Sequence, residues 1–174
     1  MRSLAVMSVC VVLLAGCRQY PESECVKYAG GTREVSMRAP MDDSSNMAVP
    51  LANKQVLAGT FASPATMKIS EVGVQIGNSG GAARGKVALK LCQDEACTIG
   101  RGDLAGSKDN DYLMIHLDSE LPLRQSRGVV RYELAREEGD GNLVVWLYPA
   151  LGKGTLVLDG KPEPRIMNLM MYQR

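Results

Sequence analysis

The strongest constraint on the fold is a series of short apolar segments that runs from about residue 55 to the end of the chain. Turn-rich stretches such as GNSGGAARG (77–85) and DGKPEP (159–164) separate these segments. In one of them, Val87, Leu89 and Leu91 alternate with lysine or alanine. A period of two residues is typical of a β-strand with one buried face. The segments are QVLAGTF (55–61), MKISEVGVQI (67–76), GKVALKL (85–91), YLMIHL (112–117), VVRYELA (129–135), NLVVWLY (142–148), TLVL (155–158) and RIMNLMM (165–171).

These segments predict one all-β domain over residues 55–174. Beyond residue 17, no window of 11 or more residues keeps the 3.6-residue apolar stripe of a helix. We therefore expect an antiparallel β-sandwich, jelly-roll-like, with about eight strands. Residues 17–54 contain several glycines and prolines and few periodic apolar residues. We expect a tether there, followed by a long loop or a weakly paired edge strand.

The N-terminus, MRSLAVMSVCVVLLAGC, has the features of a secretory signal. Arg2 is followed by 12 uncharged residues from Leu4 to Ala15. That run is shorter than the roughly 20 residues that a transmembrane helix needs. It fits the apolar region of a signal peptide, which precedes small residues at the cleavage site. Residues 1–16 are therefore predicted to be a signal peptide.

The end of this signal, LLAGC (13–17), resembles the lipobox of bacterial lipoproteins. In that family the cysteine thiol takes a diacylglycerol, the signal is cut before it, and the new amino terminus is acylated. The resemblance implies that Cys17 is the lipid attachment residue and that the protein is held at a membrane. Each buried acyl CH₂ contributes about 0.8 kcal/mol to anchoring. The alternative is an ordinary signal peptide in which the cysteine is incidental.

The residue after Cys17 bears on which membrane is used. In enterobacterial lipoproteins, an aspartate at this position tends to retain the protein in the inner membrane, and here the residue is Arg18. The resemblance therefore implies the outer membrane. The domain would face either the periplasm or the exterior.

Composition narrows the class of partner. From Cys17 onward the chain has 158 residues, with 19 basic and 19 acidic side chains. A balanced surface gives little long-range attraction for a polyanion, so nucleic acid is not an expected partner. A chain of this length forms one domain.

The cysteines fit an oxidising compartment. Four residues separate Cys92 from Cys97, which is the spacing of a ring closed across a hairpin tip. We predict a disulfide between them, worth roughly 2 kcal/mol in the chain-entropy model. With one histidine and no CxxC, a zinc site is not expected. The state of Cys25 stays open.

The strand layout also resembles accessory β-sandwich domains of the carbohydrate-binding-module type. The stretches that carry this resemblance are FASPATMKISEVGVQIGNSGGAARGKVALKLC (61–92), SKDNDYLMIHL (107–117) and RGVVRYELAREEGDGNLVVWLYP (127–149). In such domains a first strand is followed by a glycine-rich hairpin, a DN-containing loop and a strand ending in an aromatic pair. The resemblance implies a sandwich fold and admits a glycan as ligand.

A catalytic arrangement is hard to assemble from this sequence. His116 is the only histidine and shares a strand face with Tyr112 and Met114, so we interpret it as a solvent-facing residue. No GxSxG nucleophile elbow is present. Asp109 and Asp111, in KDND, are the best pair of carboxylates for acid–base chemistry. The same loop has oxygens for a structural calcium, although turn chemistry explains both residues and the spacing is not that of an EF-hand.

Trp146 and Tyr148 lie on one face of the segment NLVVWLYP and are candidates for stacking on a ligand. Leu143, Val145 and Leu147 fill the other face, so a strand buried on both sides is the simpler interpretation. We take Trp146, Tyr148, Asp109 and Asp111 as the candidate ligand-binding residues. No metal ion and no cofactor is expected.

The sequence therefore favours a non-catalytic lipoprotein of the cell envelope that acts as a binding or assembly module. Its partner would be a glycan or another envelope protein. The alternative is a small envelope glycoside hydrolase that uses the turn carboxylates.

Overall fold

The computed structural model describes residues 26–29, 32–36, 46–64, 66, 68–124, 128–152 and 154–173, with only the main chain in the first two ranges. Over these residues the chain forms strands and one short 3-10 turn, and no α-helix. The predicted all-β fold is confirmed. The elements are β1 (Val26–Ala29), β2 (Thr32–Ser36), β3 (Met47–Pro50), β4 (Val56–Ala62), β5 (Lys68–Gly77), η2 (Ser79–Gly81), β6 (Lys86–Gln93), β7 (Ala96–Asp103), β8 (Asp111–Pro122), β9 (Val129–Glu138), β10 (Val144–Pro149), β11 (Gly154–Leu158), β12 (Lys161–Glu163), β13 (Arg165–Met167) and β14 (Leu169–Gln173).

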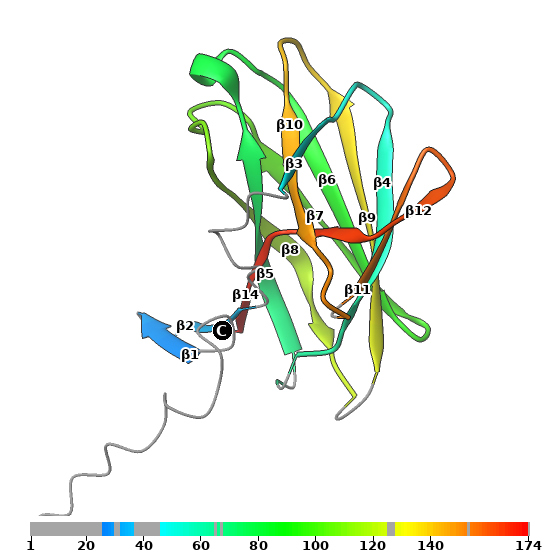
Figure 1. Ribbon diagram of the computed structural model, residues 1–174. Helices are drawn as coiled ribbons and strands as arrows, with labels where there is room; N and C mark the ends of the chain where they lie inside the picture. The colour runs from blue at the N-terminus through cyan, green and yellow to red at the C-terminus, as the bar shows by residue number, and fades with distance from the viewer. Residues whose placement is uncertain are drawn as a thin grey trace, which may run out of the picture.

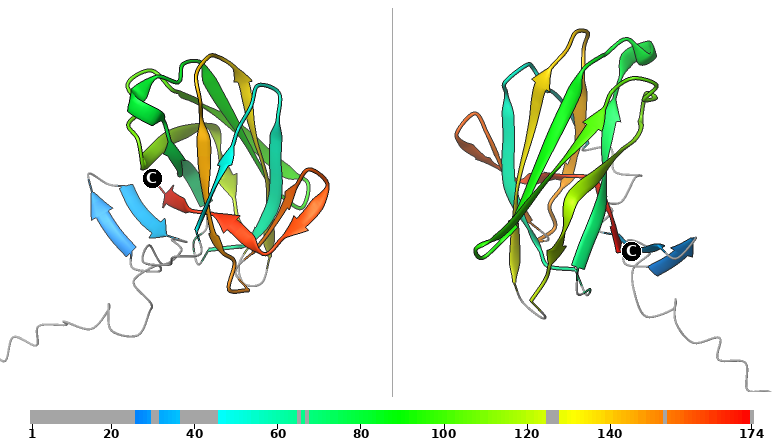
Figure 2. Two further views of the ribbon diagram at one scale, coloured as in Figure 1. Left: turned by 45° about the horizontal axis from the view of Figure 1, so that its top comes forward. Right: turned by 180° about the vertical axis from the view of Figure 1, so that it is seen from behind.

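The strands form one antiparallel sheet that curls into two layers (Figures 1 and 2). Along the sheet the order is β1-β2-β14-β5-β8-β7-β6-β9-β4-β11-β12, and β10 pairs with β3, β5 and β13. Strands β6, β7 and β8 form a meander, with β9 beside β6 and β5 beside β8. These are two overlapping Greek keys, the connection found in most sandwiches and jelly rolls. The antiparallel, sandwich-like prediction is therefore confirmed.

All eight predicted segments contain strands, but the described residues form fourteen strands rather than about eight. The last segment, RIMNLMM, divides at Asn168 into β13 and β14. Strand β7 was missed because glycines occupy two of its inward positions. A Cβ on Gly100 would lie 2.3 Å from the carbonyl oxygen of His116, and one on Gly102 would lie 3.0 Å from Leu113 and Ile115 side chains. Close approach between β7 and β8 therefore replaces the expected apolar alternation.

The folded unit also begins before residue 55. Strand β3 lies in the stretch for which we expected a loop or a weakly paired edge strand, and it pairs with β10 from Met47 to Pro50. Val49 and the following Leu51 are buried in the same core as the later strands. This short strand is thus part of the domain.

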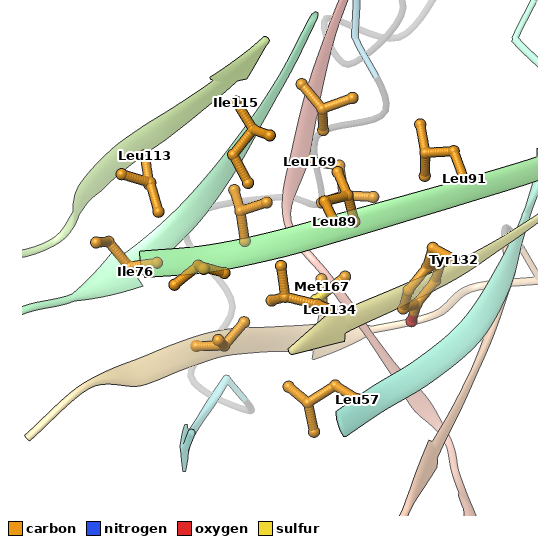
Figure 3. Packing of buried hydrophobic residues seen from close by; sticks show 14 of the residues in the cluster. Leu57, Ile76, Leu89, Leu91, Leu113, Ile115, Tyr132, Leu134, Met167 and Leu169 are labelled. Carbon is orange, nitrogen blue, oxygen red and sulfur yellow. The ribbon is translucent and has the colours of Figure 1, made fainter. Parts of the chain in front are cut away.

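One apolar cluster fills the space between the two layers (Figure 3). Inward residues of successive strands supply it, among them Leu57, Leu89, Ile115 and Leu134, each fully buried. Phe61 and Tyr132 stack within it, with ring centroids 6.2 Å apart. Burial raises the pKa of the Tyr132 phenol above its ordinary value, because the charged form would lose its water. Figure 3 shows Leu57, Leu89 and Tyr132, among others, converging from strands that are far apart in sequence.

A buried arginine secures the loops at one end of the sandwich. Arg136, on β9, is only 4% exposed. Its guanidinium donates to the carbonyl oxygens of Gly141 at 2.8 Å, Arg84 at 3.1 Å and Asp140. These carbonyls belong to the β5–β6 and β9–β10 connections, so one side chain ties two loops together.

Replacing Arg136 with methionine is expected to destabilise the domain by at least about 2 kcal/mol, since several charge-assisted hydrogen bonds are lost at once. Urea unfolding followed by fluorescence would measure this. The control is Arg131→Met on the same strand, where the exposed guanidinium donates to the Asp94 carbonyl. That change is expected to stay within about 0.5 kcal/mol. Equal effects from the two variants would contradict the assigned role of Arg136.

Candidate binding site

Aromatic and methionine side chains gather on the outer face of the layer formed by β14, β5, β8 and β10. On β5, Val72, Val74 and Ile76 point into the core, so the residues between them point outward. In the ladder, Gly73 stands opposite Met114 of β8 and Met170 of β14. We call this surface the aromatic–methionine face; it comprises the exposed Met114 and the partly buried Tyr112, Trp146, Met170 and Tyr172.

Two outward glycines of β5 shape this face. A Cβ on Gly73 would lie 2.9 Å from the sulfur of Met114 and 3.4 Å from Cβ of Met170. The glycine therefore makes room for Met114 to lie over the strand. Met114 is 36% exposed, so the sulfur-bearing side chain is also available to a partner.

The second glycine brings two predicted site residues together. A Cβ on Gly77 would lie 3.3 Å from Nε1 of Trp146 and 3.4 Å from Oδ1 of Asp109. Trp146 is partly exposed, and its Nε1 is buried without a hydrogen-bond partner among the described residues. Trp146 and Asp109 thus meet at the end of β5, although 37 positions separate them in sequence.

A buried hydrogen-bond network lies beside them. The Tyr148 hydroxyl donates to Oε1 of Gln75 at 3.0 Å, and the Asn168 amide donates to the same oxygen at 2.8 Å. Asn168 also bonds the Tyr112 hydroxyl at 2.9 Å. Gln75, Asn168 and Tyr148 are each less than 5% exposed. Tyr148 therefore packs into the domain, whereas Trp146 keeps an accessible surface.

The two carboxylates of the KDND turn, Asp109 and Asp111, do not point toward a common site. Asp111 stands opposite Ile76, an inward position, and its Oδ1 accepts from the main-chain N–H of Tyr112 at 2.8 Å. Asp109 lies against the opposite, outer side of β5. Among the described residues, no group of three or more His, Cys, Asp and Glu side chains is placed to hold a metal ion.

His116 faces solvent as expected, with 63% of its side chain exposed. Its Nδ1 lies 3.2 Å from Oε1 of Glu71 on the neighbouring strand. Both residues border the aromatic–methionine face. Together they form a polar margin along one edge of this face.

The disulfide lies next to the turn of the β6–β7 hairpin. Cys92 and Cys97 stand directly opposite each other in the ladder and are joined, so the predicted pairing is confirmed. Together with the β6–β7 pairing it closes the hairpin tip, Gln93 to Ala96. The tip is therefore held as one rigid unit.

Next to this tip, the ladder between β7 and β8 is interrupted. Main-chain pairing is confined to Gly100 with Leu117 and Arg101 with His116. The same register would pair Thr98 with Ser119. Instead the Thr98 hydroxyl donates to the Ser119 carbonyl at 2.8 Å and accepts from its N–H at 3.3 Å. A side chain therefore takes the place of a main-chain pair at this point of the ladder.

A cleft of about 400 Å³ lies beside the hairpin tip. No local pattern in the sequence marks this cleft, because its two sides are brought together only by the fold. The cleft is lined by Gln93, Asp94, Glu95 and Ala96 on one side and Pro122, Leu123 and Arg124 on the other.

Replacing Thr98 with valine is expected to destabilise the domain by about 1–3 kcal/mol, because it leaves the Ser119 N–H and carbonyl without their partner. Amide hydrogen exchange at Ser119 should accelerate in parallel. The control is Thr155→Val, which removes an exposed bond to the Thr60 hydroxyl at 2.7 Å and should have little effect. Unchanged exchange at Ser119 in the Thr98 variant would contradict the role given to this hydroxyl.

No protein-family model and no curated protein sequence matches this chain. The described residues include no helix with the length and apolar character required to cross a membrane.

Proposed function

We propose that this protein is a non-catalytic, lipid-anchored binding or assembly module of the bacterial outer membrane. The observation that carries the proposal is the aromatic–methionine face. Its residues come from β8, β10 and β14 and meet on the outside of one layer, where Met114 is 36% exposed and the others are partly buried. Exposed apolar surface bordered by polar residues is typical of a docking site.

The make-up of this face favours a protein as the partner. Methionine and tyrosine are enriched in protein interfaces, and methionine adapts its shape to different surfaces. The hydroxyls of Tyr112 and Tyr148 form hydrogen bonds within the domain, so fewer polar groups remain to hydrogen-bond a sugar. An envelope protein is therefore the first choice.

A glycan is the second choice, and Trp146 with Asp109 is the observation that favours it. An indole beside a carboxylate offers a stacking surface and a hydrogen-bond acceptor, which together suit a sugar ring. A glycan partner would place the site at the end of β5 rather than over Gly73.

The arrangement of the carboxylates supports the non-catalytic choice over a glycoside hydrolase. A pair of acids must flank one bond, at a separation of about 5–10 Å. Asp109 and Asp111 lie on different sides of the layer, and Asp111 is engaged by the Tyr112 N–H. Hydrolysis of a glycoside by the purified protein, abolished by Asp109→Ala, would overturn the proposal.

The anchor rests on Cys17, which lies outside the described residues. Changing Cys17 to serine is expected to leave an unprocessed precursor that carries no lipid, because a hydroxyl does not replace the thiol at a lipobox. Mass spectrometry of the N-terminal peptide and fractionation of outer membranes would detect both effects. A lipidated or normally cleaved serine variant would contradict the assignment.

Binding through the aromatic–methionine face is expected to be sensitive to a charge at Met114. Met114→Glu should weaken capture of the native partner at least about tenfold, because a carboxylate would be buried in an apolar contact. Chemical crosslinking in intact cells, followed by purification of the crosslinked species, measures this.

The matched control is Val56→Glu, since Val56 is 48% exposed on the outer side of β4 and lies outside the face. Both variants should keep the melting temperature of the parent within a few degrees. If Met114→Glu and the control retain the same crosslinked species, the face is not the docking surface. If a glycan array binds the parent and Trp146→Ala abolishes that binding, the glycan choice replaces the protein.

A further inference from the structure

Two methionines of the aromatic–methionine face stand on either side of one glycine. In the ladder, Gly73 of β5 is opposite Met114 of β8 on one side and Met170 of β14 on the other. A Cβ on Gly73 would lie 2.9 Å from the sulfur of Met114 and 3.4 Å from Cβ of Met170. The missing side chain leaves room over β5, and the flexible thioether of Met170 is long enough to turn into it. Two sulfurs can therefore meet above this glycine.

The side chain of His116 lies over the same strand, one ladder row further along. His116 follows Met114 by two positions on β8, so the two side chains share a face. Its Nδ1 lies 3.2 Å from Oε1 of Glu71, which stands opposite it and precedes Gly73 by two positions. The imidazole and the Met114 thioether thus both turn toward β5, in neighbouring rows. With 63% of its side chain exposed, His116 is accessible to a solute.

The contact with Glu71 prepares the imidazole to bind a metal. A histidine ligand commonly donates one ring N–H to a carboxylate, which fixes the tautomer and makes the other nitrogen a better ligand. When Nδ1 of His116 donates to Glu71, the lone pair is on Nε2. The Glu71 side chain is only 12% exposed, so its position is held by the surrounding strands. Glu71 is therefore a positioning residue for His116.

Two thioethers and one imidazole define the class of metal ion. Thioether sulfur is a soft ligand that selects Cu(I), and imidazole also binds copper. Zinc takes thiolate, imidazole and carboxylate ligands, and calcium takes oxygen ligands. The reasons against a zinc or calcium site in this chain therefore do not apply to Cu(I).

A tyrosine closes the other side of this position. Tyr112 precedes Met114 by two positions on the same face of β8, and its Cβ would lie 3.4 Å from a Cβ on Gly73. The Tyr112 hydroxyl is 2.9 Å from the side-chain amide of Asn168, which holds the ring in place. The space over Gly73 thus has a fixed wall on one side and the imidazole on the other.

We propose that the sulfurs of Met114 and Met170 and Nε2 of His116 bind one Cu(I) ion over Gly73, on the outer side of the β8–β5–β14 layer. Metal binding at this point does not depend on a docked protein, because it needs only these three side chains. Met114→Leu separates the two functions. Leucine keeps the apolar contact that docking requires, but it has no sulfur for the metal.

The test is a titration of the full-length protein, with ¹³C in its methionine methyl groups, by Cu(I) under anaerobic conditions. Free thiols are first blocked with iodoacetamide, so that no thiolate competes for the metal. We expect one Cu(I) per chain to bind with a dissociation constant below about 1 μM, measured in competition with bicinchoninate. The methyl resonances of Met114 and Met170 should shift, whereas that of Met171, which is buried in the core, should stay in place.

The variants Met114→Leu, Met170→Leu and His116→Gln should each weaken Cu(I) binding at least about tenfold, because each removes one of three ligands. The matched control is Met171→Leu on the core side of β14, which should bind as the parent does. Exchange of methionine for leucine conserves volume, so these variants should fold.

Three results would each overturn the proposal: no Cu(I) retained by the parent, unchanged affinity in Met114→Leu and Met170→Leu, or equal weakening by Met171→Leu. Displacement of the bound Cu(I) by an equal concentration of Zn²⁺ would also overturn it, since that would indicate harder ligands than thioethers. If a variant does not fold, the methyl shifts of the parent protein decide the matter.

Discussion

A single antiparallel sheet that must curl around its own apolar core is the constraint on which the rest of this structure depends. Regular pairing favours a continuous twisted surface, and closure into two layers requires that the ladder break or change partners. Each break leaves main-chain groups that water reaches poorly, and buried groups of this kind have to be satisfied. In this domain, polar side chains satisfy them.

The clearest example is Asn168, between β13, which pairs with β10, and β14, which pairs with β5. Its N–H lies 3.4 Å from the Trp146 carbonyl, and its own carbonyl accepts from the Gln75 N–H at 3.1 Å. The side-chain amide then bonds Gln75 and the Tyr112 hydroxyl. One fully buried residue thus joins two strands that diverge beyond Val145 and Ile76. Thr98 and Arg136 act similarly at other breaks, so closure of the sheet depends on a few polar residues as much as on the core.

The sequence predicted the strands in which apolar residues recur at every second position. It did not predict the strands in which that alternation is interrupted. The eight apolar segments were found because Val87, Leu89 and similar residues repeat with a period of two. Strand β7 was missed because Gly100 and Gly102 stand where apolar residues were expected, and β3 because it is short and ends in proline. The Cys92–Cys97 disulfide was predictable because it depends on a local spacing.

The candidate site residues were likewise predictable by type but not by position. Trp146 and Asp109 were identified as candidates by residue type, but their meeting at Gly77 results from the β10–β5 pairing, which no local pattern encodes. Met114 and Met170 were read as ordinary strand residues. Their gathering depends on which strands become neighbours, and on Gly73 between them.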